Sequence, residues 1–583
     1  HYLFIIEKGP GGYFSEAALL REGMTLVRLG NYKKAIEELQ AHVNRYPNSE
    51  LLQEATFWLA EARFLSQDYQ GAVRTYQQVN PKGDRGMEAS YGLGWAFFKL
   101  GDWARAAEIF NAFVQTYPKS PWRPDALFRM AEAKSNQRAY DEANSLYYEL
   151  ATQYPTSDLA SKAYYQIGLN YHKLGKFDQA RKVFQLLVTK YPQSNFTQEA
   201  QYRTGEALFK EGKYSEARKQ LLDFIQRNPG SPFLAAAWLI LADSFYNEQN
   251  YEQALNYYRD IPKRFPSSSE AIESEYGALL TLYQQDEYSS FITGSKDFAD
   301  KYPQHPLSYP ILYQRAEHLL AKKDYAGALD TYTELIRKNP KHELADDAQL
   351  RIAEIYFQTG QYSEAIRSYQ SLLTDFPDSN VKAEAVFNLG KLFVELKDYS
   401  RALDYFRQLL TSFPNSQLIP ATLFESAKLL WEMQKKEEAI TYLHRLISNY
   451  PESPFQNQGF LKLGHYYLAK EEHLKALEYF KKAIQSKEPD ISAQAQLGFG
   501  QTLAAMGDLK QSVAELLKIV YLFPEKKELV TNALLEAGGY YEKLGNWDEA
   551  IAVYNKILSQ NKEEKIQTLA QNKIRQLTQK RKK

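Results

Sequence analysis

The sequence contains no cysteine among its 583 residues. This absence excludes disulfide bonds, thiolate metal sites and a cysteine nucleophile, and it leaves no cysteine in the chain to which a lipid could be attached. Long apolar runs are also missing, because none approaches the roughly 18 residues needed to span a bilayer. We therefore predict that no segment of this chain crosses a membrane directly.

Net charge is absent as well, since 71 basic residues balance 71 acidic ones. A balanced chain creates no global field that would attract nucleic acid or an anionic membrane, so the expected partners are proteins or peptide segments. The chain begins at His1 and not at a methionine. We expect further residues upstream, where a signal peptide, a lipid anchor or another domain could stand, and we interpret 1–13 as an N-terminal remnant or linker.

The dominant positive feature is a period of 37 residues. It is marked by ten prolines: Pro118, Pro155, Pro192, Pro229, Pro266, Pro303, Pro340, Pro377, Pro414 and Pro451. A fixed spacing of this size indicates stacked repeats, in which each unit packs only on its neighbours. Hydrophobic residues make up 44% of the chain and aromatic residues 14%, so each unit has apolar surface to bury.

Residues 157–194 show how one repeat folds. The first half places apolar residues on one helical face at spacings of three and four: Tyr164, Ile167, Gly168 and Tyr171. Gly175 ends this helix, and a second helix opens near Phe177. Tyr191 and Pro192 stop the second helix, because proline restricts its predecessor and cannot continue the hydrogen-bond ladder. The repeat is therefore predicted to be a helical hairpin.

Capping residues agree with this reading. Asp or Asn directly precedes several second helices, where its side chain can accept free amide groups: Asp68, Asp102, Asn250, Asp324, Asp398 and Asn546. A serine two residues after the proline can cap the next first helix: Ser49, Ser120, Ser157, Ser194, Ser231, Ser379, Ser416 and Ser453. His305 and His342 replace this serine in two units, so we assign them the same local role.

Small residues recur at matched places in the two helices. A glycine or alanine such as Gly168 or Ala242 stands on the first helix, and an alanine such as Ala180 or Ala254 follows twelve residues later. A glycine inside a helix costs about 1 kcal/mol relative to alanine, so close helix packing must offset that loss.

These residues resemble the tetratricopeptide repeat. In the unit above, the residues at the family's spacings are Tyr164, Ile167, Gly168, Tyr171, Phe177, Ala180, Phe184 and Pro192. The resemblance covers almost the whole chain and implies an all-α, right-handed α-solenoid superhelix of about fifteen hairpins. The Tyr/Phe-Pro-x-Ser junction is similar to that of periplasmic repeat proteins of bacterial envelopes, such as outer-membrane assembly lipoproteins and Tol-associated coordinators.

Five segments follow from the period: 1–13, units one to seven at 14–267, a divergent unit eight at 268–304, units nine to fifteen at 305–560, and 561–583. In the last segment, helical spacing predicts a capping helix with Ile566, Leu569, Ile574 and Leu577 on its apolar face. The basic residues 580–583 are expected to form a disordered tail.

Unit eight departs from the pattern at four positions: Leu279, Phe291, Gly294 and Ser295. Leu279 and Phe291 fill the two small sites, and overfilling such a contact costs about 1–3 kcal/mol per site. We expect these helices to splay or shift register, which would make a hinge or a partner-binding notch. Mutual compensation of the four changes is the alternative. A second irregularity, Asn80–Gly86, shortens one repeat and predicts an exposed, flexible junction.

Catalytic chemistry is not expected from this sequence. His342-Glu343 begins like a zinc-protease motif, but Asp346 stands where the second histidine is required. The pair Gly92 and Gly94 lies inside a first helix and not in a strand-to-helix turn, so a nucleotide-binding reading fails. We predict neither an enzyme activity nor a cofactor or metal.

The resemblance places the first helices on the concave face, where partner segments bind in this family. The aromatic positions there are Phe57, Tyr91, Phe128, Tyr165, Tyr202, Tyr276, Tyr313, Phe387 and Phe424. The charged positions four residues later are acidic and then basic: Glu61, Glu132, Glu206, Asp243, Glu317, Glu354, Lys391 and Lys428. The aromatic series replaces the lysine and asparagine clamp with which some family members hold acidic tails. We predict partner binding along this face, with packing between repeats as the alternative role of the aromatics.

The sequence thus favours a non-catalytic interaction scaffold of a bacterial envelope assembly or secretion machine, in the periplasm or at the outer membrane. One alternative is the recruiting arm of a larger enzyme or exopolysaccharide exporter, and another is a homo-oligomeric array. A cytoplasmic location is the alternative placement. The identity of the partner and the oligomeric state stay open at this point.

Overall fold

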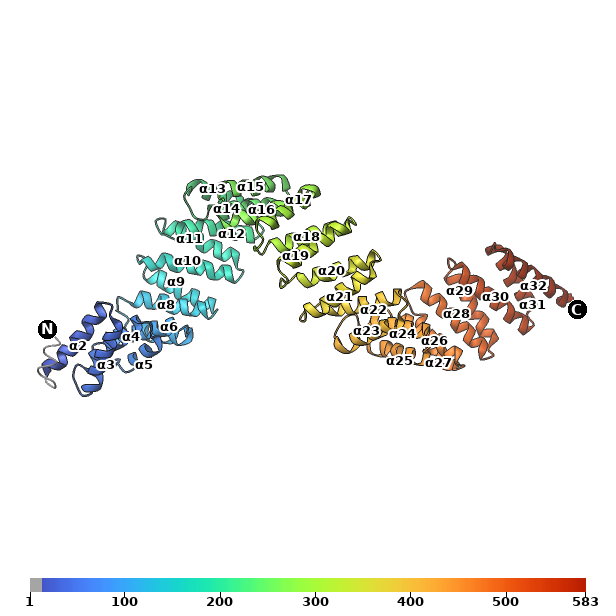
Figure 1. Cartoon of the computed structure of the whole chain (residues 1–583), viewed down its shortest axis with the longest axis horizontal. Helices are drawn as coiled ribbons and strands as arrows, with labels where there is room; N and C mark the ends of the chain where they lie inside the picture. The colour runs from blue at the N-terminus through green and yellow to red at the C-terminus, as the bar shows by residue number, and fades with distance from the viewer. Residues whose placement is uncertain (1–12, 583) are drawn as a thin grey trace. The chain divides into compact units, whose positions relative to one another are not determined.

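The computed structural model describes residues 13–582, which form 31 α-helices and no strand. The chain divides into two compact units, His1–Tyr302 and Pro303–Lys583. Of the segment 1–13, all but Tyr13 lies outside the described residues. Within each unit the helices follow one another as antiparallel pairs (Figure 1).

The first unit contains eight hairpins. Their helices are α2 (Tyr13–Arg28), α3 (Tyr32–Arg45), α4 (Leu52–Leu65), α5 (Tyr69–Tyr76), α6 (Gly86–Lys99), α7 (Trp103–Thr116), α8 (Arg123–Asn136), α9 (Tyr140–Gln153), α10 (Asp158–Lys173), α11 (Phe177–Lys190), α12 (Thr197–Lys210), α13 (Tyr214–Arg227), α14 (Leu234–Asn247), α15 (Tyr251–Arg264), α16 (Ser269–Gln284) and α17 (Tyr288–Lys301). First helices of successive hairpins contact each other directly, as α4 and α6 do, so they line one common face.

The second unit contains seven hairpins and a final helix. Its helices are α18 (Ser308–Ala321), α19 (Tyr325–Lys338), α20 (Ala345–Gln358), α21 (Tyr362–Asp375), α22 (Lys382–Glu395), α23 (Tyr399–Ser412), α24 (Ile419–Glu432), α25 (Lys436–Asn449), α26 (Gln456–Ala469), α27 (His473–Ala483), α28 (Pro489–Ala505), α29 (Leu509–Leu522), α30 (Lys527–Leu544), α31 (Trp547–Gln560) and α32 (Glu564–Lys582). Eight and seven hairpins confirm the expected fifteen, and the all-helical repeat fold is confirmed with them.

Every hairpin turns through one residue with a left-handed backbone. Seven hairpins place glycine there: Gly30, Gly101, Gly175, Gly212, Gly360, Gly507 and Gly545. Eight place another residue: Gln67, Arg138, Gln249, Asp286, Lys323, Lys397, Gln434 and Glu471. The left-handed region is unfavourable for residues with a Cβ, so the tight turn between the paired helices imposes this conformation on both sets.

The capping predictions are confirmed with two corrections. Asp68, for example, accepts the amide of Gly71 at 2.9 Å, whereas Asn546 makes no side-chain cap. Ser157 is the N-cap of α10. Most of the other serines instead bind the amide two residues on, in the turn before the helix, as Ser194 binds Phe196. His305 and His342 accept the equivalent amides through Nδ1 at 3.3 and 3.1 Å.

The recurring glycine of the first helices packs directly against a large side chain of the second helix, sixteen positions later in the sequence. A Cβ on Gly168 would lie 2.3 Å from the ring of Phe184, and one on Gly390 would lie 2.4 Å from Phe406. The same relation holds for Gly23–Leu39, Gly94–Phe110, Gly205–Leu221, Gly464–Phe480, Gly500–Leu516 and Gly538–Tyr554. The close contact is therefore between a glycine and a bulky side chain, which refines the expected pairing of two small residues.

Hairpin eight reverses this relation. Leu279 is the large residue on the first helix, and a Cβ on Gly294 of the second helix would lie 2.6 Å from its Cδ2 atom. Phe291 and Ser295 are buried, and the Ser295 hydroxyl donates to the carbonyl of Phe291 at 2.6 Å. Helices α16 and α17 contact each other less extensively than the helices of any other hairpin. A cavity of about 400 Å³ lies among α15, α16 and α17.

The last helix packs on α31, but its buried residues differ from the expected set. Ala570 and Leu577 are buried, with Ile566 and Ile574 packed beside them. Leu569 is 43% exposed, because the face turned to α31 passes through the next residue. The expected disordered tail is also wrong as far as Lys582, because α32 continues to that residue and Arg581 pairs with Asp548 at 2.9 Å.

Candidate functional site: an aromatic cavity in hairpins two to four

A cavity of about 500 Å³ lies on the face lined by first helices in the first unit. Its walls come from α4, α5 and α6, and Trp122 closes it at the start of α8. The lining residues are Phe57, Glu61, Phe64, Leu65, Tyr76, Glu88, Tyr91, Gly92, Trp95, Lys99 and Trp122. Most of this wall is aromatic, and Glu61, Glu88 and Lys99 are its charged residues. A cavity of this size accommodates one or two large side chains of a partner.

Two local features of the sequence create the cavity. Helix α5 has 8 residues, whereas most second helices have 14. The side of the cavity that α5 forms is therefore short. Gly92 lacks a side chain at the point where a Cβ would lie 2.5 Å from the ring of Tyr76. The ring of Tyr76 therefore packs against this glycine and forms a buried part of the cavity wall.

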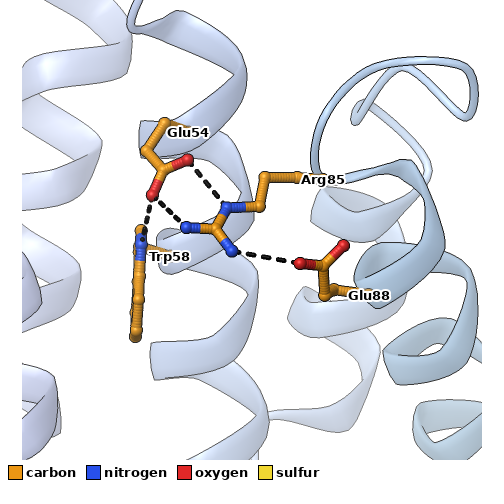
Figure 2. A network of polar contacts seen from close by, with 4 residues as sticks. All are labelled: Glu54, Trp58, Arg85 and Glu88. Carbon is orange, nitrogen blue, oxygen red and sulfur yellow. Dashed lines mark hydrogen bonds and ion pairs between the residues drawn. The ribbon is translucent and has the colours of Figure 1, made fainter. Parts of the chain in front are cut away.

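The short junction after α5 is held by ion pairs, which Figure 2 shows. Arg85 binds both carboxylate oxygens of Glu54 at 2.6 and 2.7 Å and reaches Glu88 at 3.1 Å. Trp58 donates to the same Glu54 at 3.0 Å. Arg85 is the strongest influence on Glu54 and lowers the pKa of its carboxyl group. Residues 80–84 are exposed as expected, whereas the next residue, Arg85, ties hairpin two to hairpin three.

The polar groups of the cavity are engaged by neighbours within the fold. The hydroxyl of Tyr76 donates to Glu61, and burial raises the pKa of Glu61 against the opposing effect of this hydrogen bond. Tyr91 donates to Asp125 at 2.5 Å. Burial and then this hydrogen bond raise the pKa of Tyr91 to about 12. Both tyrosines thus stay neutral and hold their rings in place.

The aromatic positions predicted for partner binding pack between successive hairpins. Several stack on a ring near the start of the next first helix: Tyr91 on Trp122, Tyr165 on Phe196, and Tyr202 on Phe233. Phe57, Phe128, Tyr165 and Tyr202 are buried, and Tyr313 is half-buried against Tyr332. Of the predicted aromatics, Phe57 and Tyr91 line the cavity.

The acidic positions each hold a partner inside their own hairpin. A tyrosine fifteen residues later donates to three of them: Tyr76 to Glu61, Tyr258 to Asp243 and Tyr332 to Glu317. An arginine three residues earlier pairs with the others: Arg129 with Glu132, Arg203 with Glu206 and Arg351 with Glu354. The arginines compensate the charges of Glu132, Glu206 and Glu354. The tyrosine hydroxyls satisfy one hydrogen bond of Glu61, Asp243 and Glu317 without cancelling their charge.

The basic positions that follow are held differently. Lys428 pairs with Glu425 at 2.9 Å. Lys391 is exposed and, within residues 13–582, has no carboxylate within 4 Å; its ammonium lies 5.9 Å from the ring of Phe387. The structure thus brings Glu61 into the cavity with Phe57 and Tyr91, while the lysines lie in the other unit.

Sequence reasoning missed most of the cavity. Trp95, Trp122, Phe64 and Leu65 line it. Trp95 and Leu65 stand at positions that are mostly polar in the other repeats, whereas the positions of Phe64 and Trp122 are apolar in most repeats but were not among the predicted site residues. The available signal was the combination of the shortened spacing before Gly86 and the extra glycine at position 92. In residues 13–582 there is no cluster of three or more potential metal ligands. None of the described helices is long and apolar enough to cross a membrane.

Paired helices of about 14 residues, glycines that make room for large side chains of the paired helix, and a common face lined by first helices define a tetratricopeptide repeat protein. This chain is one, and it resembles the outer-membrane-associated members found in bacteria. Models of the tetratricopeptide repeat match residues 236–268, 344–415, 421–453, 458–490 and 532–563. A model described as an outer membrane lipoprotein matches residues 14–157 and 157–250.

Two curated relatives are outer membrane protein assembly factors BamD. The chain is 26% identical over 154 residues to that of Pasteurella multocida, covering 23% of this chain and 59% of the relative. It is 27% identical over 137 residues to that of Haemophilus influenzae, covering 20% and 52%. The chain thus spans little more than half the length of these relatives.

Solved structures also match. A chain of the APC/C hetero-tetramer Cut9–Hcn1 is 16% identical, with 96% of each chain covered and a TM-score of 0.29. The C-terminal part of a repeat-containing protein from Cytophaga hutchinsonii is 19% identical, with 44% of this chain and 98% of that chain covered and a TM-score of 0.35.

Proposed function

We propose that this protein is a non-catalytic interaction scaffold of a bacterial complex that assembles the outer membrane, and that it acts at the periplasmic face of that membrane. Support comes from the repeat fold and from the similarity of residues 14–250 to outer membrane lipoproteins. The observation that supports the proposal most is the aromatic cavity, which lies inside that matched segment. Its lining residues pack against one another and leave an open space between them.

In this proposal, an extended partner segment lies along the first helices of the first unit and inserts one large apolar side chain into the cavity. Trp95 and Trp122 would supply apolar contact area, with Phe57 and Tyr91 beside them. Burying such a side chain contributes about 1.5–3 kcal/mol. The carboxylates of Glu61 and Glu88 at the wall favour a segment whose neighbouring residues are basic or neutral.

A peptide array tests the cavity directly. Nine-residue segments whose central residue runs through all twenty amino acids are expected to bind best with Phe, Tyr, Trp or Leu at the centre. Leu65→Glu places a charge at the rim and should remove this preference. Leu396→Glu is the matched control, because Leu396 is 41% exposed and Leu65 is 42% exposed at the ends of corresponding helices. Equal loss in both variants would contradict the cavity as the binding site.

Location and partners need a separate test in bacterial cells. A photo-crosslinking amino acid in place of Trp95 should couple the protein to outer-membrane or periplasmic proteins, identified by mass spectrometry. The same group in place of Lys482, on the second helix α27, serves as the control position. Crosslinks confined to cytoplasmic proteins would overturn the proposed setting while leaving the cavity test unaffected.

A further inference from the structure

The cavity of about 400 Å³ among α15, α16 and α17 has an apolar wall made of Tyr258, Ala278, Leu279 and Phe298. Two of the three helices, α15 and α17, are the second helices of successive hairpins. The wall does not include Tyr276, the residue of α16 at the position predicted to bind partners. We call this space the hairpin-eight cavity, and it is separate from the aromatic cavity of hairpins two to four.

Hairpin eight lacks a tyrosine ring that several other hairpins have. Gly294 on α17 stands where four second helices carry tyrosine: Tyr257, Tyr405, Tyr442 and Tyr479. In hairpin seven the ring of Tyr257 packs against Trp238 and Phe245 of its own first helix, with ring centres 5.4 and 5.3 Å apart. A glycine has no side chain with which to fill the corresponding place in hairpin eight.

Two further residues show that the hairpin-eight cavity occupies the place of that ring. Glu275 aligns with Trp238 and lines the cavity. Ala278 also lines it and aligns with Leu241, a fully buried residue of the cluster on which Tyr257 packs. A smaller residue at each of two positions, one on each helix of the hairpin, therefore leaves open the space that the tyrosine ring takes in hairpin seven.

The polar groups of the cavity leave contacts for a partner. Lys301 and the hydroxyl of Tyr302 both donate to Oε1 of Glu275, at 2.7 and 3.0 Å, whereas Oε2 receives no hydrogen bond from any described residue. Arg259 and Asp297 line the cavity from α15 and α17, are exposed, and form no ion pair within residues 13–582. A hydroxyl that enters the cavity can therefore donate to Oε2, and residues beside it can pair with the two free charges.

We propose that the hairpin-eight cavity binds a tyrosine side chain of a partner protein, on a segment with an acidic residue before or after the tyrosine and a basic residue on its other side. The ring takes the place left open by Gly294 and Ala278, and its hydroxyl donates to Glu275. The flanking residues pair with Arg259 and Asp297. This goes beyond the scaffold role proposed above, because it adds a second contact surface that does not depend on the aromatic cavity.

Hydrogen exchange of the full chain with p-cresol, the side-chain analogue of tyrosine, locates the site. Saturating p-cresol is expected to slow exchange in α16 and α17 by at least about threefold. Ala278→Leu should remove this protection, because it restores the leucine of hairpin seven, and Leu65→Glu in the other cavity should leave it unchanged. Protection that persists in Ala278→Leu, or that appears only in α4–α6, would overturn the proposal.

A labelled peptide, Glu-Gly-Tyr-Gly-Lys, tests the partner segment by fluorescence anisotropy. The Leu65→Glu variant is used, so that the aromatic cavity does not contribute. A peptide with alanine at its centre should not bind, and one with phenylalanine should bind about threefold more weakly because it lacks the hydroxyl. Arg259→Gln and Asp297→Asn should each weaken binding about threefold.

Arg227→Gln is the matched control, because this exposed arginine of the second helix α13 already pairs with Asp223 at 2.8 Å. An equal loss in that variant, or equal binding of the alanine peptide, would overturn the proposal. Thermal unfolding of Ala278→Leu separates a filled cavity from a damaged fold. The melting temperature should stay unchanged or rise, and a lowered value would show that the space is not open to a side chain.

Discussion

Gly538 lies against the ring of Tyr554, so that a Cβ on this glycine would stand 2.7 Å from the Cζ atom of the tyrosine. Gly539, the next residue of the same helix, has no such neighbour within 4 Å. The two glycines have the same chemistry and almost the same place in α30, and they differ only in what the second helix presents to them.

This difference predicts opposite effects of one substitution. Alanine is favoured over glycine in a helix by about 1 kcal/mol, whereas overfilling a tight contact costs about 1–3 kcal/mol. Gly538→Ala should therefore lower the local stability of α30 and α31 by roughly 1 kcal/mol, and Gly539→Ala should raise it by up to about 1 kcal/mol. Amide hydrogen exchange in these helices measures both changes. Equal changes in stability for the two variants would contradict the close packing of Tyr554 against Gly538.

The left-handed turn residues predict a second pair of opposite effects. Lys397 has φ of 59° and Gly360 has φ of 76° at equivalent places. Because a Cβ costs about 1–2 kcal/mol in this conformation, Lys397→Gly should stabilise its hairpin by roughly 1 kcal/mol and Gly360→Ala should destabilise it by a similar amount. Gly230→Ala is the control, since Gly230 has no positive φ and nothing within 4 Å of an added Cβ. Thermal unfolding of the purified chain checks the three variants.

Asp243 predicts a pH dependence of stability. Burial raises its pKa to about 6, although the hydroxyl of Tyr258 donates to it at 2.6 Å. The folded state therefore binds the proton more tightly than the unfolded state, and this residue's contribution to stability falls as pH rises from about 4 to about 6. Asp243→Asn should abolish this contribution and stabilise the protein by up to about 3 kcal/mol at pH 7, with little effect at pH 3.5. Unfolding measured at both pH values decides the matter, and a uniform gain would contradict it.

Hairpin eight allows a double-mutant cycle. Gly294→Ala should destabilise α16 and α17 by about 1–3 kcal/mol, because the added methyl group meets Leu279. Adding Leu279→Ala should reduce that penalty, which gives a coupling energy between the two sites. Additive losses would contradict the compensated contact.

The hinge at Leu279, Phe291, Gly294 and Ser295 remains a proposal, and hydrogen exchange of the unmodified chain tests it. A hinge requires faster exchange in α16 and α17 than in α14 and α15. Equal protection of the two hairpins would favour compensated packing instead.

Short-range sequence rules were enough to predict the helical hairpins. The prolines at intervals of 37 residues, Gly175 at a helix end and Asp68 at a helix start act within one turn of the chain, so the sequence shows them directly. The periodic pattern also marked hairpin eight as different. What the pattern could not show was that Leu279 and Gly294 compensate each other, since the two residues lie on different helices and only their distance reveals the contact.

The candidate sites show the same division. Phe57, Glu61 and Tyr91 were recognised because they repeat. Trp95 replaces a residue that is charged in most repeats and was missed, and Trp122 was missed although its position is apolar in most repeats. The series Glu132, Glu206 and Glu317 was recognised as charged, but only the structure shows that each carboxylate already has a partner. Gly294 was recognised as a departure from the repeat, but only the structure shows the open space beside it.

The amino-acid order alone thus determined that this chain is a run of fifteen helical hairpins, because caps, turns and helical periodicity are short-range properties of neighbouring residues. Tertiary structure decided where a cavity opens and which carboxylates are hydrogen-bonded or ion-paired within their own hairpin. These depend on the distances between side chains of different helices, and a linear pattern does not contain those distances.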